Sequence, residues 1–158
     1  MKTPENAVGK FEAFIAKKKF EAQPYPNYYP GLADEKMQTI LTERINQIAL
    51  DFKEVALSNN PTDKKYHEKM AIGLARFSEI YLETDSEDLD RICCYVEEIM
   101  DIIALESSNG QLNKFRYSFE PKYKIRFLLK YLNSKLKLIT LEKTFNFIVS
   151  NSNFLFEL

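Results

Sequence analysis

The chain has 158 residues, of which 45% are hydrophobic and 28% are charged, a composition typical of one soluble globular domain and not of a disordered chain. With 22 basic and 23 acidic residues the formal net charge is −1, so the composition provides no general attraction to nucleic acid. No apolar run approaches the roughly 18 residues that a membrane span needs, and residues 1–10 lack the apolar core of a secretory signal, so we expect a cytoplasmic protein that does not enter a membrane.

Residues 1–22 predict an N-terminal amphipathic helix. Val8, Phe11 and Phe14 recur at helical spacing and would form its buried face. The run Lys17–Lys19 follows near the carboxyl end, where the helix dipole favours positive charge. We interpret this lysine run as a solvated helix end.

Residues 23–33 cannot continue that helix and predict an extended connector, called the strap below. Its stiffness comes from three prolines, Pro24, Pro26 and Pro30. It also carries three tyrosines, Tyr25, Tyr28 and Tyr29. The strap either lies across the domain with its tyrosines sealing the edge, which we favour, or presents them as an aromatic docking surface for a partner.

Residues 34–107 predict the core helices, at 34–57, 62–83 and 86–107. The first has a continuous apolar seam of Met37, Leu41, Ile45, Ile48, Phe52 and Val55. Gly73 interrupts the seam of the second helix and predicts the close approach of a neighbouring helix. The short connections between these helices favour antiparallel neighbours.

The helix at 86–107 has the clearest division into an apolar and an acidic face. Its apolar stripe contains Leu89, Ile92, Val96, Ile99 and Ile103. Its opposite face carries Asp90, Glu97, Glu98 and Asp101. We expect Asp85 or Ser86 to cap its start and Asn109–Gly110 to close its end.

Residues 108–158 form a basic C-terminal segment. We expect 111–121 to be irregular or a single helical turn, and 122–138 to be a helix. Residues 136–158 fit a last helix, a hairpin or an extended tail, because apolar residues also alternate there. The whole chain, 1–158, therefore predicts a single all-α domain, an antiparallel helical bundle of five or six helices.

Charge is unevenly distributed along the chain. Residues 79–106 contain ten acids and one base, whereas residues 111–143 contain nine bases and two acids. Either the two stretches lie together and offset each other, which we favour, or one of them recruits an oppositely charged partner.

Most familiar catalytic arrangements are unsupported. The single histidine, His67, is predicted to be an ordinary surface residue, and Cys93 and Cys94 are adjacent, a spacing that suits neither a disulfide nor a metal pair. Glycine-rich phosphate loops are absent, and aromatic residues among the C-terminal bases are only a weak sign of nucleic-acid binding. We expect no cofactor.

One acidic pattern could hold a metal ion. Glu97, Glu98 and Asp101 lie one helical turn apart, and such acids can share a hard cation such as Mg²⁺. All-α nucleotide pyrophosphatases use helix acids of this kind with a second acidic pair on a facing helix. Only loose candidates exist for that second pair, namely Glu79 with Glu83 and Asp51 with Glu54.

Several segments resemble a family of small bacterial domains of unknown function. They are Tyr29–Leu32, Cys94–Ile103, Leu105–Gly110 and Leu112–Phe115, and the resemblance covers about residues 25–120. It implies a compact helical domain in a bacterium and transfers no catalytic residue.

The leading hypothesis is a non-catalytic cytoplasmic interaction or regulatory protein, of which an immunity-type inhibitor is one form, with an unknown protein partner. Its candidate partner-binding residues are Tyr25, Tyr28, Tyr29, Glu97 and Asp101. The alternative is a metal-dependent hydrolase that uses Glu97, Glu98 and Asp101. The sequence does not identify a partner, a substrate or an oligomeric state.

Overall fold

The computed structural model of the protein describes residues 3–118, which belong to one compact unit of the chain, Met1–Pro121. Its α-helices are α1 Ala7–Ala16, α2 Gln38–Leu57, α3 Asp63–Ala75, α4 Ser86–Ile102 and α5 Gln111–Ser118. Between residues 3 and 118 the extended structure is a single β-bridge, Gln23 to Tyr29. The predicted all-α helical bundle is confirmed.

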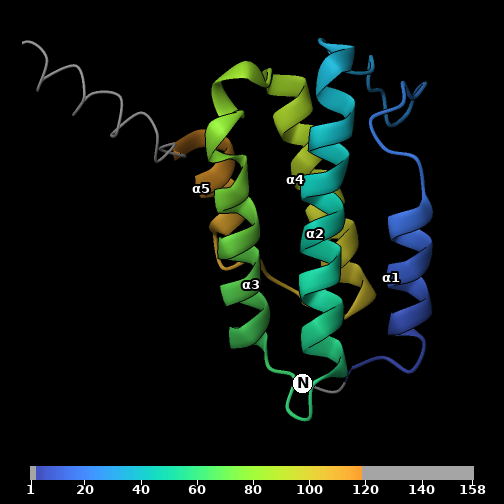
Figure 1. Cartoon of the computed structure of the whole chain (residues 1–158), viewed down its shortest axis with the longest axis vertical. Helices are drawn as coiled ribbons and strands as arrows, with labels where there is room; N and C mark the ends of the chain where they lie inside the picture. Colours follow the sequence, from blue (N-terminus) through green and yellow to red (C-terminus); the bar gives the residue numbers. More distant parts are fainter. Residues whose placement is uncertain (1–2, 119–158) are drawn as a thin grey trace, which may run out of the picture. The chain divides into compact units, whose positions relative to one another are not determined.

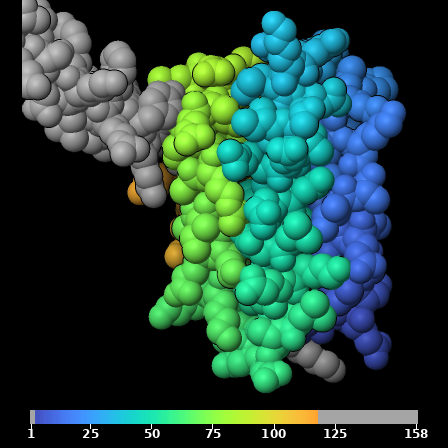
Figure 2. Space-filling view, viewed as in Figure 1, coloured from blue at the N-terminus to red at the C-terminus, as the bar shows by residue number. Residues whose placement is uncertain are grey.

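Successive helices α1 to α4 run in alternating directions (Figure 1). Helix α2 lies between α1 and α3 and also packs against α4, which in turn contacts α1 and α5. Side chains of α1, α2 and α3 form the continuous surface seen in Figure 2. Helix α4 lies behind α2 in this view (Figure 1).

The core is built from the faces that the apolar spacing predicts. Leu41, Ile45 and Ile48 of α2 are fully buried, as are Ile92 and Val96 of α4. Burial of such side chains contributes roughly 1.5–3 kcal/mol each. Tertiary packing of amphipathic faces therefore accounts for most of the stability of these helices.

The close approach predicted at Gly73 is confirmed. A Cβ atom at this position would lie 2.5 Å from Cγ1 of Ile48, which is closer than side-chain atoms can pack. Helix α3 can therefore approach α2 at this point only because residue 73 has no side chain.

The helix predicted at 62–83 is shorter than expected. Helix α3 ends at Ala75, and two 3₁₀ turns follow, Arg76–Glu79 and Tyr81–Glu83. The Ser78 hydroxyl donates to the Ala75 carbonyl oxygen at 2.6 Å and so satisfies a backbone acceptor at the helix end. The apolar spacing continues through these turns, which is why it predicted one longer helix.

The helix predicted at 86–107 ends at Ile102. Ala104 adopts a left-handed conformation with φ of 53°, and the Leu105 amide donates to the Met100 carbonyl oxygen at 3.0 Å. This is the pattern of a Schellman cap, so Ala104 closes α4 where Asn109–Gly110 was expected to do so. Burial of the Leu105 side chain accompanies this turn.

Other boundaries also differ from the prediction. The N-terminal helix covers Ala7–Ala16 of the expected 1–22. The segment 111–121, expected to be irregular or a single helical turn, contains the eight-residue helix α5. Leu112 and Phe115 are the buried residues of α5. The predicted helix at 122–138 and the alternatives for 136–158 lie outside the described residues.

Candidate functional site

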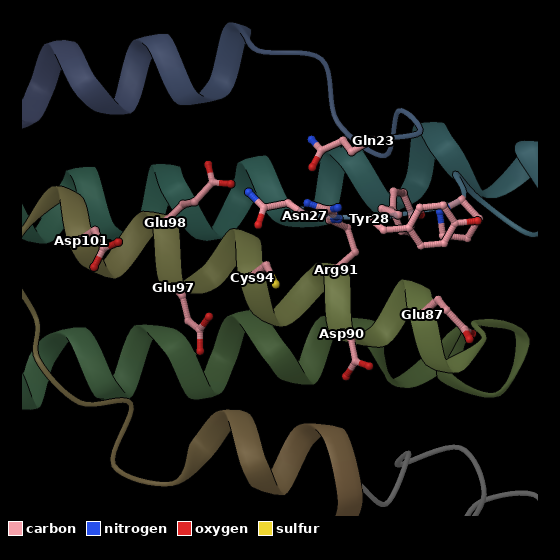
Figure 3. Close-up of a pocket in the computed structure, with 12 residues that line it drawn as sticks. Gln23, Asn27, Tyr28, Glu87, Asp90, Arg91, Cys94, Glu97, Glu98 and Asp101 are labelled. Carbon is pink, nitrogen blue, oxygen red and sulfur yellow. The ribbon is translucent and has the colours of Figure 1, made fainter. Parts of the chain in front are cut away.

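A groove of about 760 Å³ separates the strap from the outer face of α4 (Figure 3). The strap lines it with Gln23, Asn27, Tyr28, Tyr29 and Pro30. Helix α4 contributes five carboxylates, Glu87, Asp90, Glu97, Glu98 and Asp101. The groove therefore brings together the two segments that the sequence had marked separately as partner-binding candidates.

The amphipathic spacing of α4 places its acids in this groove. Residues three or four apart lie on one side of a helix, so burial of the Ile92–Val96 side turns the acids outward. The Asp85 side chain caps the helix by accepting a hydrogen bond from the Asp88 amide at 2.8 Å, which confirms the predicted start.

The strap is fastened to α4 by a buried pair. The Tyr29 hydroxyl donates to Oδ1 of Asp88, and both side chains are buried. Two backbone hydrogen bonds between Gln23 and Tyr29, of 2.8 and 3.0 Å, close the strap into a loop. The Arg91 guanidinium lies 4.5 Å from the centre of the Tyr29 ring and covers its outer side.

Burial dominates the electrostatics of this pair. It raises the pKa of Asp88, while the hydrogen bond from Tyr29 acts in the opposite direction. Burial also raises the pKa of Tyr29, and its hydrogen bond to Asp88 adds to that effect. The phenol therefore stays protonated and remains the donor at physiological pH.

The three strap tyrosines have different environments. Tyr29 is 3% exposed and seals the edge of the bundle, whereas Tyr28 is 67% exposed and lines the groove. Tyr25 is 87% exposed and does not line it. The two interpretations of the strap thus apply to different residues: Tyr29 closes the fold, and Tyr28 offers an accessible ring.

The carboxylates of α4 also differ in their surroundings. Asp90 pairs with Arg116 of α5, and Glu98 pairs with Lys17. Glu97 and Asp101 are exposed, and neither forms an ion pair with a residue of the described chain. Within the part of the chain that the structure describes, these two carboxylates are therefore available to a further cation.

The described acids of α4 do not gather into a three-ligand group. Figure 3 shows Glu97 and Glu98 pointing toward opposite edges of α4. Within residues 3–118, no group of three or more His, Cys, Asp or Glu side chains could hold a metal ion. Of the two loose candidates for a second acidic pair, Asp51 with Glu54 is engaged in ion pairs: Asp51 with Arg76 at 2.6 Å and Glu54 with Lys69 at 2.8 Å.

Histidine and cysteine often act in catalysis, but in this fold His67, Cys93 and Cys94 have the environments of structural residues. Nε2 of His67 lies 2.8 Å from the Ser107 carbonyl oxygen, so the ring links α3 to the loop before α5. Burial raises the pKa of the Cys93 thiol to about 12 and also raises that of Cys94. Both thiols are therefore mainly protonated near neutral pH, and the half-buried Cys93 is the less accessible of the two.

The sequence-based candidates did not include several polar residues of the groove, among them Arg91 and Asn27. Arg91 was the single base within an acidic stretch, and this isolation could have indicated a specific contact. Asn27 gave no signal, because its place depends on the path of the strap.

Among residues 3–118, none of the helices combines the length and apolar character required of a transmembrane segment.

The comparisons with known proteins identify a family without assigning an activity. The chain is similar to a DUF3571 family protein from Acinetobacter baumannii AYE, whose crystal structure shares 26% sequence identity with a TM-score of 0.63. The match covers 78% of this chain and 94% of that one. No curated protein matches the chain. The family model of DUF4844, a domain of unknown function, matches residues 2–120, which confirms the resemblance and extends it through α1. The chain therefore belongs to the DUF4844 family of domains of unknown function.

Proposed function

We propose that this chain is a non-catalytic interaction or regulatory protein that acts in the bacterial cytoplasm and binds a protein partner in the groove between the strap and α4. The observation that carries this proposal is a single groove lined by exposed Tyr28 and by two carboxylates, Glu97 and Asp101, that form no ion pair with the described residues. An immunity-type inhibitor, which covers a basic site on its target, is one form that such a protein takes.

The chemistry of the groove suits a protein partner. Tyrosine supplies a large apolar ring with a polar tip and is enriched at protein interfaces. Carboxylates around such a ring select a partner of opposite charge and speed its association. Because Tyr28 and Asp101 lie toward opposite ends of α4 in Figure 3, the groove offers two separated anchor points.

The strap is held in place before any partner arrives. The Tyr29–Asp88 hydrogen bond and the Gln23–Tyr29 bridge fix its backbone on either side of Tyr28. Ordering a loop on binding has a free-energy cost, so a strap that is already fastened favours tighter binding.

A capture experiment with the full-length protein tests the proposal. Immobilised wild-type protein and the variants Tyr28→Ala, Asp101→Lys and Glu43→Lys are each exposed to a bacterial lysate. Glu43 is the matched control, because it is an exposed carboxylate on α2, outside the groove. Far-UV circular dichroism checks that each variant folds.

We expect the wild type and Glu43→Lys to retain the same protein and the two groove variants to lose it. Mass spectrometry of the eluted fractions provides the measurement. Retention of identical proteins by all four forms, or of no protein by the wild type, would contradict the proposed function.

A further inference from the structure

A second hollow of about 400 Å³ lies between α1 and α4. Ala13 and Phe14 of α1 and Ile102 of α4 form its apolar part. It shares Glu98 and Asp101 with the groove beneath the strap, so the two hollows meet at the last turn of α4. The Lys17–Glu98 ion pair lies at this junction.

We propose that the two hollows form one docking channel for an extended basic segment of a partner protein, whose cationic side chains lie along α4 and whose apolar side chain enters the hollow against α1. This inference rests on the proposed function and specifies the chemistry of the partner at the same site.

The charge balance of the channel selects a basic occupant. The five carboxylates of the groove are opposed by Arg91 inside it and by Arg116 and Lys17 in ion pairs at its edges. Among residues 3–118, negative charge thus remains in excess in the channel, at Glu97 and Asp101 in particular. The same excess repels phosphate groups and so disfavours a nucleic acid.

The protein already holds its own guanidinium groups in the way proposed for the partner. Arg91 lies 4.5 Å from the Tyr29 ring centre, and Arg116 lies 5.1 Å from the Tyr117 ring centre while pairing with Asp90. Arginine suits such sites because its flat cation stacks on aromatic rings and pairs with carboxylates. The accessible Tyr28 ring provides a further surface of this type.

The length of the channel indicates an extended occupant. Glu87 and Asp101 both line the groove, and the helix between them is about 21 Å long at 1.5 Å per residue. About six or seven residues of extended chain span that distance at roughly 3.3 Å each. Different side chains of the same partner segment would then contact Tyr28 and Asp101.

Fluorescence anisotropy with the full-length protein tests the channel. The probe is the labelled peptide Leu-Arg-Ser-Arg-Ser-Arg-Leu, compared with the same peptide carrying Glu for Arg and with the short peptide Arg-Ser-Arg. Three variants report on different places: Tyr28→Ala at the strap, Asp101→Asn at the junction, and Ala13→Trp, which fills the hollow against α1. Glu43→Gln is the control away from the channel.

We expect the seven-residue basic peptide to bind and the acidic peptide not to bind. Tyr28→Ala and Asp101→Asn should each lower the affinity for the basic peptide about fivefold, which is the loss expected for one exposed contact of this kind. Ala13→Trp should lower the affinity for the seven-residue peptide by a similar factor and leave the affinity for the short peptide unchanged. Glu43→Gln should bind like the wild type.

Three results would overturn the channel. The first is an affinity for the acidic peptide equal to that for the basic one. The second is an equal affinity for spermine, which carries positive charge without a peptide backbone. The third is an affinity for the seven-residue peptide that Ala13→Trp leaves unchanged. Each can occur while the capture experiment still shows a partner that depends on Tyr28 and Asp101. Failure of the channel and failure of the proposed function are therefore distinguishable.

Discussion

Cys93 and Cys94 are neighbours in α4, yet the fold gives their thiols different accessibility. Cys93 is half-buried at the edge of the apolar stripe, whereas Cys94 is exposed in the groove. Burial is the largest cause of the rise in the pKa of Cys93 to about 12, and neighbouring acids add to it. At pH 8 the Cys93 thiol is then almost entirely protonated.

We predict that iodoacetamide modifies Cys94 and spares Cys93 in the folded protein at pH 8, because the thiolate is the nucleophile and Cys93 is both protonated and half-buried. Intact-mass analysis should show one adduct in native buffer and two in denaturant. The variant Cys94→Ser should show none in native buffer. Native adducts forming on Cys93 as fast as on Cys94 would contradict the difference.

Lys19 shows how one residue within a charged run can differ from its neighbours. The whole run Lys17–Lys19 was predicted to be solvated, but the Lys19 side chain is buried. Its ammonium group donates to the carbonyl oxygens of Phe14 at 2.7 Å and Lys17 at 3.0 Å, which the end of α1 leaves without helical partners. Burial, reinforced by Lys17, lowers the pKa of Lys19 to about 8.

At the scale of the elements, the contact between α2 and α3 depends on one missing side chain. We predict that Gly73→Ala destabilises the protein by about 1–2 kcal/mol. The added Cβ would force the buried Ile48 side chain to move, at a cost of about 1–3 kcal/mol. The higher helix propensity of alanine offsets no more than about 1 kcal/mol of that cost.

Gly9→Ala is the matched control for this experiment. Gly9 also lies within a helix, α1, but a Cβ there would meet nothing within 4 Å. We expect it to leave stability unchanged or raise it by about 0.5–1 kcal/mol. Urea unfolding of the full-length chain measures both, and equal stability of the two variants would show that α3 does not need the glycine.

At the scale of the whole molecule, the question is whether the carboxylates of α4 bind a protein partner or a metal ion. We predict that Mg²⁺ or Mn²⁺ up to millimolar concentration leaves the Tm of the full-length protein unchanged, since Glu97 and Glu98 point apart and the described residues contain no group that could hold a metal ion. Differential scanning fluorimetry measures this. A rise in Tm that Asp101→Ala abolishes would favour the hydrolase alternative.

The sequence by itself determined which faces are buried. Apolar residues at helical spacing predicted the buried sides of α2 and α4, and Gly73 predicted a close helix contact. Both predictions depend on local properties, namely the period of a helix and the size of a side chain. For the same reason the acids predicted to lie opposite the apolar stripe do line the outer groove, namely Asp90, Glu97, Glu98 and Asp101.

Only the tertiary structure decided how these faces combine. The left-handed turn at Ala104 is followed by the buried Leu105. Tyr29, unlike its neighbour Tyr28, is buried and hydrogen-bonded to Asp88, 59 residues further along. The groove likewise needs the strap to lie against α4. Such contacts join residues far apart in the chain, and whether they form depends on three-dimensional packing, which local spacing does not encode.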